Sequence, residues 1–412
     1  MRKTTRRALL AAGGALGVLG AAAALGFPRL ARQPAPDGPL SGEASALLER
    51  AWQGLDPARV IDCHVHLAGT GTGNSGCFVN PRMQSALRHP IQFARFSIYK
   101  RAAGIDDMAR ADDDFVERLA TLARWGPKHG RFVVLAFDMV HHEDGTADAA
   151  ASEFYVPNDW ALTVAARHPD CFLPAASVHP YRKDAVAELE RAAARGAVCV
   201  KWLPNAQHID PSSPRCDETY RALARLGLPL LTHAGHEAAV EAEEEQKLGN
   251  PLLLRRALDA GVKVIVAHCA SSGQGADLDV HGHDQPEVDS FDLFLRLLDE
   301  PGWRGQLWGD VSALIQFNRC DKLARLLERP EVHARLLNGS DYPLPAINVL
   351  ARSGKLESLG LVTSEERALL DEIDRHSGLC FDFAAKRVAR RNGVGFADSV
   401  FQPPLGLYPA RV

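Results

Sequence analysis

The sequence lacks the cysteine spacings that hold a structural metal or define a disulfide framework. It contains eight cysteines, but no Cys-x-x-Cys pair and no zinc-knuckle spacing. Cys63, Cys199 and Cys269 instead lie within or beside short apolar runs that predict strands. We therefore expect most of the cysteines to be small buried residues rather than disulfide partners.

The sequence also lacks a strong excess of one charge. It carries 47 Lys and Arg against 51 Asp and Glu, which gives a formal net charge of -4. Proteins that bind nucleic acid usually carry a basic patch or stripe, so this balance argues against nucleic acid as a partner. A small-molecule substrate is the partner that we expect, and the sequence leaves the oligomeric state open.

No long Gly-, Ser- or Pro-rich linker occurs after residue 45. By length alone, a chain of 412 residues could form one large α/β barrel or two average domains. On the strand pattern described below, we assign residues 1–35 to a targeting segment with its linker, and residues 36–412 to a single barrel domain.

The N-terminal segment has the form of a Tat export signal. The twin-arginine pair Arg6-Arg7 precedes a weakly apolar Ala/Gly/Leu stretch at 8–26. That stretch reaches the length of a spanning helix, so an uncleaved membrane anchor is the alternative, and this segment is the one expected membrane tether. Both interpretations place the folded domain in the periplasm.

After residue 57, short β-branched runs alternate with longer helical stretches, which is the pattern of repeated strand-helix units. Strands are predicted at 59–66, 131–138, 172–178, 197–203, 228–233, 262–268, 306–311 and 335–339. Helices are predicted at 113–125, 158–168, 183–195, 216–226, 250–260, 290–299, 320–328 and within 363–393. Eight such units predict a closed (β/α)8 TIM barrel.

Polar side chains end five of the predicted strands. They are His64 and His66, Lys201, His233, His268 and Asp341. If the strands are parallel members of one barrel, all six side chains meet at its C-terminal mouth, where barrel enzymes keep their chemistry.

The pair His64-x-His66 is the core of this set. Side chains at i and i+2 of a strand face the same way, about 6 to 7 Å apart, close enough to share one metal ion. Catalytic sites usually take further ligands from elsewhere, and His233 and Asp341 fit that need. The second such pair, His281-x-His283, lies in a Gly/Asp-rich stretch and indicates a solvated loop, with a metal role as the less favoured alternative.

Taken together, these motifs resemble the amidohydrolase superfamily over residues 57–385. The phrases that carry the resemblance are His64-x-His66, Val200-Lys201-Trp202-Leu203-Pro204, Thr232-His233-Ala234-Gly235, His268 and Gly339-Ser340-Asp341-Tyr342-Pro343. They are similar to the branch of TIM-barrel metal-dependent hydrolases that also contains lactonases and decarboxylases.

The resemblance implies a role for each residue. His64, His66 and His233 would be neutral nitrogen ligands of one or two divalent ions, most simply zinc. Asp341 would bind the metal and accept a proton from water, and His268 would orient the substrate or stabilise charge on its carbonyl oxygen.

Lys201 leaves two alternatives open. In two-metal members a lysine at this place is carboxylated and bridges two ions, with His268 as a ligand of the second ion. In one-metal members the ammonium would pair with an anionic substrate group, because it carries donors only.

The expected function is hydrolysis of a small-molecule amide, ester or lactone. A decarboxylase or hydratase on the same fold is the alternative chemistry, since a similar metal site can bind a carboxylate beside the scissile bond. A non-catalytic metal- or ligand-binding envelope protein is the alternative of another class.

Two weaker features are also placed near the mouth. The glycine-rich segment 69–76 lacks both a P-loop lysine and the GxGxxG order, so we expect a flexible active-site loop rather than a phosphate site. Several polar residues after other strands could touch substrate, although plain loop polarity explains them as well: Asp138, His141, His142, His179, His236 and Glu237.

Export through the Tat route can be tested by replacing both arginines of the pair, as Arg6→Lys with Arg7→Lys. Because this route carries folded proteins, it would allow metal loading in the cytoplasm before export. The doubly substituted protein should remain inside the cell, as measured by fractionation and immunoblotting. Normal periplasmic levels of that variant would contradict the assignment.

Overall fold

The computed structural model describes residues 38–282, 285–347 and 350–409. The predicted export signal lies outside these residues, and so does His283. Within the described ranges, none of the helices is both long enough and apolar enough to span a bilayer.

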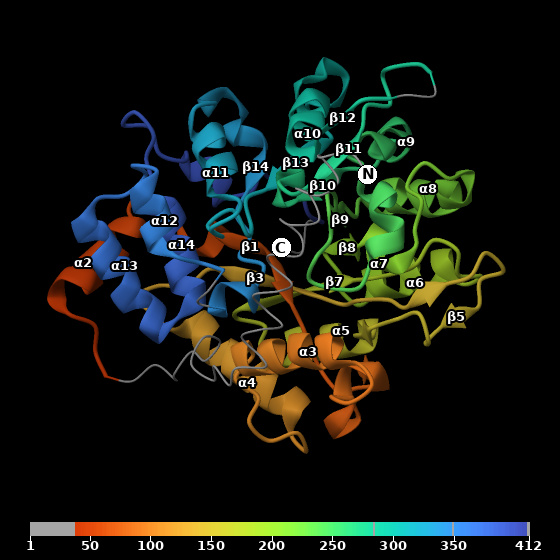
Figure 1. Cartoon of the computed structure of the whole chain (residues 1–412), viewed down its shortest axis with the longest axis horizontal. Helices are drawn as coiled ribbons and strands as arrows, with labels where there is room; N and C mark the ends of the chain where they lie inside the picture. The colour runs from red at the N-terminus through yellow and green to blue at the C-terminus, as the bar shows by residue number, and fades with distance from the viewer. Residues whose placement is uncertain (1–37, 283–284, 348–349, 410–412) are drawn as a thin grey trace.

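Eight parallel strands form one sheet at the centre of the molecule (Figure 1). In their order around the sheet they are β1 (Ile61–His66), β3 (Arg131–Leu135), β7 (Phe172–Ala176), β8 (Cys199–Trp202), β9 (Leu230–His233), β10 (Val264–Ala267), β13 (Leu307–Asp310) and β14 (Leu336–Leu337). Each lies within a predicted strand. The predicted TIM barrel is therefore confirmed.

The barrel closes where β1 meets the chain around and after β14. Cys63 N donates to the Asn338 carbonyl at 2.9 Å, and Asp341 N donates to the His64 carbonyl at 2.8 Å. We call this contact between residues 61–66 and 338–342 the closing seam. It brings Asp341 beside the His-x-His pair, although they are far apart in sequence.

A register irregularity in β1 separates its core half from its site half. The pairing with β3 shifts between Asp62 and Val65. Ile61 and Cys63 belong to the apolar cluster inside the barrel, whereas Val65 packs in the cluster against the outer helices. Such a bulge re-aims the side chains that follow it. Here it lets His64 and His66 face the mouth.

Apart from polar residues near their ends, the other strands are apolar on both faces, because the barrel interior and the helices cover them. In β10, Ile265 joins the interior cluster, while Val264 and Val266 join the outer one. Leu407 and Tyr408 also belong to the interior cluster. The C-terminal segment thus contributes to the barrel core.

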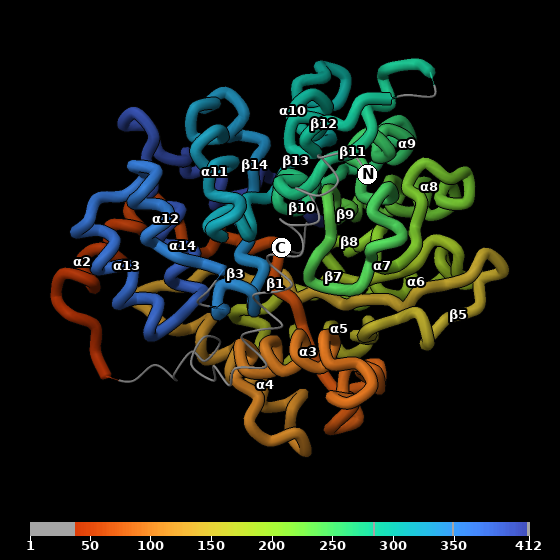
Figure 2. Tube along the Cα trace, viewed as in Figure 1, coloured from red at the N-terminus to blue at the C-terminus, as the bar shows by residue number. Residues whose placement is uncertain are grey.

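The predicted helices surround the sheet, as the traces in Figures 1 and 2 show. They are α4 (Ala111–Arg124), α5 (Asn158–Arg167), α6 (Ala185–Ala194), α8 (Asp217–Leu226), α9 (Arg255–Asp259), α10 (Ser290–Asp299), α11 (Cys320–Leu327), α13 (Ser364–His376) and α14 (Gly378–Val388). The helix predicted at 250–260 begins instead as a 3-10 turn, Pro251–Leu254, which the Asn250 side chain caps.

Four α-helices of the described residues were not predicted. They are α2 (Gly42–Ala51), α3 (Pro90–Ala102), α7 (Pro204–Gln207) and α12 (Ser353–Ser358). The helix α3 lies within the long interval between β1 and β3. Its apolar residues are spread around the helix without one clear face, and so the 3.6-residue period does not reveal it.

The glycine-rich segment 69–76 is wrapped around the buried carboxylate of Asp112. Asp112 accepts hydrogen bonds from Thr70 N at 2.6 Å, Gly71 N at 3.1 Å and the Thr72 hydroxyl at 3.0 Å. These contacts hold the segment to the start of α4, in contrast to the flexible loop that the sequence suggested. Because a carboxylate already occupies these donors, they do not offer a phosphate site.

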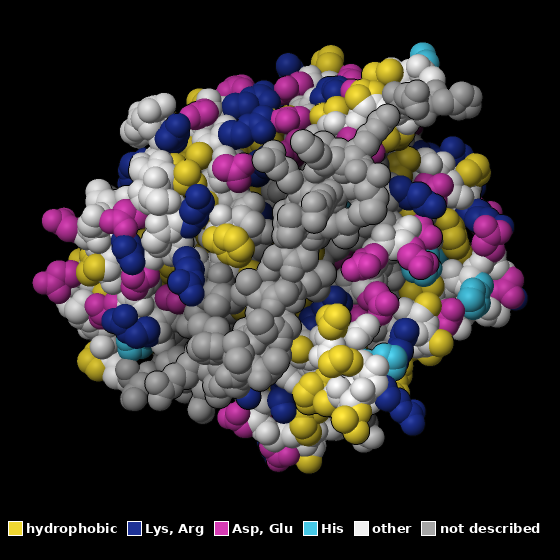
Figure 3. Space-filling view, in the orientation of Figure 1, with side chains coloured by type: hydrophobic (Ala, Val, Ile, Leu, Met, Phe, Trp, Pro, Cys, Tyr) yellow, Lys and Arg dark blue, Asp and Glu magenta, His cyan; other side chains and the backbone are white. Residues whose placement is uncertain are grey.

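All eight cysteines are free thiols, seven of them buried and Cys380 partly exposed. This confirms the prediction of small buried residues. On the face in Figure 3, positive and negative side chains are interspersed rather than gathered by sign. Apolar side chains gather on the lower part of that face, and the large apolar residues exposed on α3 and the turn before it are Leu87, Ile91 and Phe93.

The closing seam can be tested at Gly339. A Cβ added there would lie 2.9 Å from His64 Cβ and 3.2 Å from Ser312 Cβ. Gly339→Ala should therefore lower the free energy of unfolding by about 1–3 kcal/mol, the usual cost of overpacking. Denaturant unfolding measures the change.

Gly302→Ala is the matched control, because an added Cβ there meets nothing within 4 Å. Equal effects of the two substitutions would contradict the close approach at the seam.

Candidate functional site

The closing seam brings three possible ligand atoms together. His64 Nε2 lies 3.2 Å from His66 Nε2, and Asp341 Oδ1 lies 3.1 Å from His66 Nε2 and 3.5 Å from His64 Nε2. This group has the composition and spacing of a metal site. Two imidazole nitrogens this close cannot both direct N–H bonds at each other, so a shared cation or proton suits the space between them.

The histidines that end β9 and β10 join this group. The His268 ring stacks on His64 with centroids 4.9 Å apart, and the His233 ring meets His268 edge-on at 5.3 Å. His268 Nε2 lies 4.0 Å from Asp341 Oδ2. His233 Nε2 is buried without a hydrogen-bond partner in the described structure. An orphaned lone pair of this kind is available to a metal ion.

Lys201, in β8, completes the set. Its side chain is 1% exposed, and its Nζ lies 3.0 Å from His64 Nε2. The six residues predicted at strand ends therefore do meet at one place. The geometry does not assign their chemical roles.

Three of the imidazoles are held from behind through Nδ1, so that Nε2 faces the centre. The partners are Asp310 Oδ2 for His64 at 2.8 Å, Ser312 Oγ for His268 at 2.7 Å, and Glu237 Oε2 for His233 at 3.5 Å. Such outer partners fix the tautomer and orientation of metal-ligating histidines.

Asp310 is the most important of these partners, and the sequence analysis missed it. Its Oδ2 contacts His64, while its Oδ1 accepts hydrogen bonds from His268 N at 2.9 Å and Ser312 N at 3.0 Å. It ends β13, so the strand-end rule that selected the other six residues would also have selected it.

Burial favours the neutral form of three of the imidazoles, those of His64, His233 and His268. Desolvation lowers the pKa of His64 and His268 well below the usual value, with further lowering of the His64 pKa by the Lys201 charge. It also lowers the pKa of His233 to about 4, although Glu237 opposes this shift. A neutral imidazole is the form that binds metal, so the site is electrostatically prepared for a cation.

Burial acts on the two charged members as well. It lowers the pKa of Lys201, against the opposing effect of nearby carboxylates. It raises the pKa of Asp341, against the hydrogen bond from His66. Each group is thus held closer to its neutral form than it would be in water.

The backbone at the site adopts an uncommon conformation. Asp341 has φ 61°, and His268, Cys269 and Ala270 have φ between 50° and 54°. Left-handed φ values are rare for residues other than glycine and cost energy, so they persist only where the surroundings impose them. Here they occur at two of the six site residues.

Buried polar groups next to the site stabilise the closing seam. Asp62 Oδ1 accepts hydrogen bonds from His64 N at 3.0 Å and Ser340 N at 2.9 Å. Lys386 Nζ, from α14, donates to the Gly339 carbonyl at 2.5 Å. These bonds hold β1 and the residues around Asp341 in a fixed position relative to each other.

Most of the weaker candidates lie apart from this centre. Asp138 accepts hydrogen bonds from His179 N at 2.8 Å and from Arg182 at 3.1 Å, in a cluster that contains none of the six residues. His236 lines a separate hollow. Glu237 is the exception, because it contacts His233.

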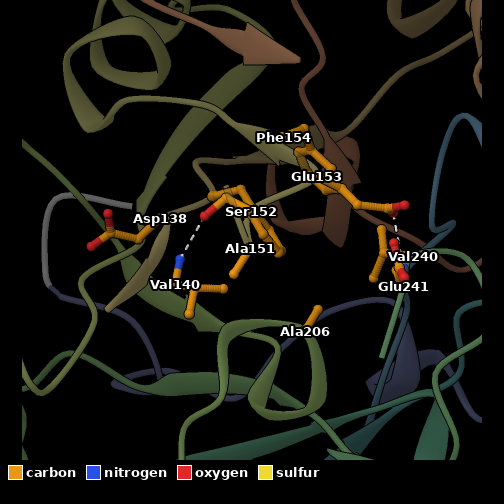
Figure 4. Close-up of a pocket in the computed structure, with 10 residues that line it drawn as sticks. Asp138, Val140, Ala151, Ser152, Glu153, Phe154, Ala206, Val240 and Glu241 are labelled. Carbon is orange, nitrogen blue, oxygen red and sulfur yellow. Dashed lines mark hydrogen bonds between the residues drawn. The ribbon is translucent and has the colours of Figure 1, made fainter. Parts of the chain in front are cut away.

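Figure 4 shows a small pocket lined by segments that follow β3, β8 and β9, and its lining contains none of the six residues. Val140 N donates to Ser152 Oγ at 2.9 Å, and Glu241 N donates to Glu153 Oε2 at 2.9 Å. The polar atoms drawn there with dashed lines are thus satisfied within the protein.

Comparison with known proteins decides the family. A family model described as amidohydrolase matches residues 61–348, well over half of the chain. The chain belongs to the amidohydrolase family. No curated protein matches its sequence.

Several solved structures resemble this amidohydrolase at low identity. A putative 2-pyrone-4,6-dicarboxylic acid hydrolase from Pseudomonas putida is 18% identical, covers 80% of this chain and 99% of its own, and gives a TM-score of 0.41. A 4-oxalomesaconate hydratase from Rhodopseudomonas palustris is 15% identical, with 80% and 95% covered and a TM-score of 0.40.

A 5-carboxyvanillate decarboxylase from Novosphingobium aromaticivorans, in a structure with bound manganese, is 14% identical, with 84% and 97% covered and a TM-score of 0.46. At these identities and TM-scores, the three structures do not single out a reaction for this amidohydrolase. Its family supports metal-dependent catalysis on the barrel.

The role of Asp310 can be tested by Asp310→Asn, which keeps the size of the side chain but weakens its bond to His64. Losing such an outer partner typically lowers metal affinity about 10- to 100-fold. We expect that loss when zinc binding to the amidohydrolase is measured by competition with a chelator.

His64→Ala combined with His66→Ala should abolish binding in the same assay. The control Asp299→Asn removes a carboxylate that is ion-paired with Arg329 at 2.7 Å, away from the site. It should leave metal affinity unchanged. Native affinity in Asp310→Asn would contradict the assigned role.

Proposed function

We propose that this amidohydrolase is a metal-dependent hydrolase of a small-molecule amide, ester or lactone. The observation that carries the proposal is the meeting of His64 Nε2, His66 Nε2 and Asp341 Oδ1 within 3.5 Å, beside the orphaned Nε2 of His233. Nitrogen ligands with one carboxylate suit zinc, the metal that we propose, bound as one or two ions.

His64, His66, His233 and Asp341 would hold the metal. A bound divalent ion supplies a Lewis acid for a carbonyl oxygen and lowers the pKa of water toward neutrality. The protein favours the neutral, metal-binding form of His64 and His233 through burial, and it fixes the orientation of these two rings through Asp310 and Glu237.

Asp341 is the proposed proton acceptor. Its Oδ1 faces His64 and His66, while its Oδ2 is directed toward His268 Nε2 at 4.0 Å. The two oxygens can therefore serve different purposes, one in holding the metal and one in taking a proton. The raised pKa of this buried carboxyl makes it a better proton acceptor than an exposed aspartate.

His268 and Lys201 are proposed to act on the substrate carbonyl and its surroundings. Ser312 fixes the His268 ring through Nδ1, which leaves Nε2 to contact substrate. Lys201 has the lowered pKa that carboxylation by carbon dioxide requires, since only the neutral amine reacts. As an ammonium, it would instead attract an anionic group.

One observation favours a lyase as the second candidate. Lys201 is buried and no carboxylate lies within ion-pair distance of its ammonium in the described structure. A substrate carboxylate beside the metal would supply the missing partner, as decarboxylation requires. A non-catalytic envelope protein is less well supported, because every residue of the predicted ligand set is present at the site.

We also propose that the enzyme is exported, on the strength of the Arg6-Arg7 pair that precedes the apolar stretch. An uncleaved segment would tether it to the membrane.

Asp341→Asn tests the catalytic role. Asparagine keeps the size and one oxygen acceptor but loses the negative charge and basicity, so metal should be partly retained. General-base assistance is worth about 10² to 10⁴ in rate, and turnover should fall by at least that much. The measurement is kcat on a substrate found by screening esters, lactones, amides and carboxylated analogues.

Elemental analysis and thermal unfolding of the same sample control for lost metal and lost fold. A folded, metal-loaded variant with near-native turnover would refute the role of Asp341. Release of carbon dioxide instead of hydrolysis products would select the lyase.

A further inference from the structure

Arg319 is a partly buried cation that the proposed mechanism does not use. It lies between β13 and α11, directly before Cys320. The residue is partly exposed, but its Nε is buried and has no hydrogen-bond partner in the described structure. Among the residues that the structure describes, the guanidinium makes one side-chain hydrogen bond, from Nη1 to Ser271 Oγ at 2.9 Å.

The positive charge of Arg319 interacts at long range with carboxylates of the site. Asp341, Glu237 and Asp310 are the carboxylates that interact electrostatically with the Arg319 guanidinium, none of them at ion-pair distance. Ser271, its tether, follows the left-handed turn that begins at His268. The guanidinium therefore borders the mouth that holds the six site residues.

No carboxylate lies within ion-pair distance of Arg319 among the residues that the structure describes. This is unfavourable for the folded protein, because a desolvated charge costs free energy unless it is paired. Arginine cannot escape this cost by losing its proton. The exposed surface of the protein, by contrast, pairs many of its arginines, including Arg255, Arg296 and Arg329.

A guanidinium in this state is suited to one class of ligand. It has five N–H donors in a planar fork that matches both oxygens of a carboxylate, and one of them is engaged by Ser271. A carboxylate on the substrate would pair the charge and satisfy the unused donors together. Neutral substrates would leave both unsatisfied.

We propose that Arg319 binds a carboxylate of the substrate, so that the enzyme acts on small organic acids in which the scissile bond lies near an anionic group. This inference rests on the proposed function for the reaction itself, but the binding step is independent of it. Arg319 is thereby a specificity-determining residue at the edge of the mouth.

Equilibrium binding of unreactive probes tests this step without a known substrate. The probes are formate, acetate and benzoate, each compared with its neutral amide at constant ionic strength, by calorimetry and thermal shift. Zinc-loaded native protein should prefer at least one acid over its amide. Arg319→Gln should reduce that preference about 10- to 100-fold, the range for hydrogen bonds to a charged group.

Three further samples make the result specific. Arg319→Lys should restore part of the preference, because it keeps the charge without the fork. Arg329→Gln should leave the preference intact, since Arg329 pairs with Asp299 at 2.7 Å on the surface. His64→Ala with His66→Ala should retain it without metal, which separates Arg319 from direct binding of the acid to zinc.

Absence of any acid preference in native protein would overturn the proposal, and so would an unchanged preference in Arg319→Gln. Loss of the preference in the metal-free variant would assign it to the metal instead. A purely structural role would lower the melting temperature of Arg319→Gln, whereas removal of an unpaired charge should leave it unchanged or raise it. None of these readouts depends on turnover, so they stand even if hydrolysis is not found.

Discussion

The close contact between β1 and the chain after β14 is the constraint on which the site depends. It closes the barrel and sets His64 and His66 against Asp341, through the hydrogen bond from Asp341 N to the His64 carbonyl. Gly339 permits the approach, since a side chain there would strike His64. The left-handed backbone at Asp341 is stabilised by these surroundings. The contact that closes the barrel therefore also places the proposed metal ligands.

Around this contact, some buried charged groups are paired with other groups of the protein, whereas others lack a carboxylate partner. Lys386 has both Asp382 and the Gly339 carbonyl as partners, and it stabilises the closing seam. Lys201 and Arg319 have no carboxylate partner within the described ranges. The paired Lys386 lies next to the closing seam. The unpaired Lys201 and Arg319 border the mouth of the barrel, where a ligand can reach them.

The strands could be predicted because the barrel buries both of their faces, which leaves short apolar runs with polar ends in the sequence. The same rule located all six residues that meet at the site. It did not locate Asp310, since it was applied to histidine, lysine and one aspartate only. Glu237 could be named only as one of several loop candidates and Arg319 was not selected, because loop residues reach the site through turns that leave no period in the sequence. The wrapping of 69–76 around Asp112 depends equally on a tertiary contact.

The cysteines have a consequence for where such a chain can fold. Burial raises the pKa of all eight thiols, for example that of Cys199 to about 12 and that of Cys171 to about 11. Oxidation and exchange proceed through the thiolate, which is scarce under these conditions. The barrel therefore keeps the same internal contacts in reducing and in oxidising surroundings, and it needs no thiol chemistry to mature after synthesis.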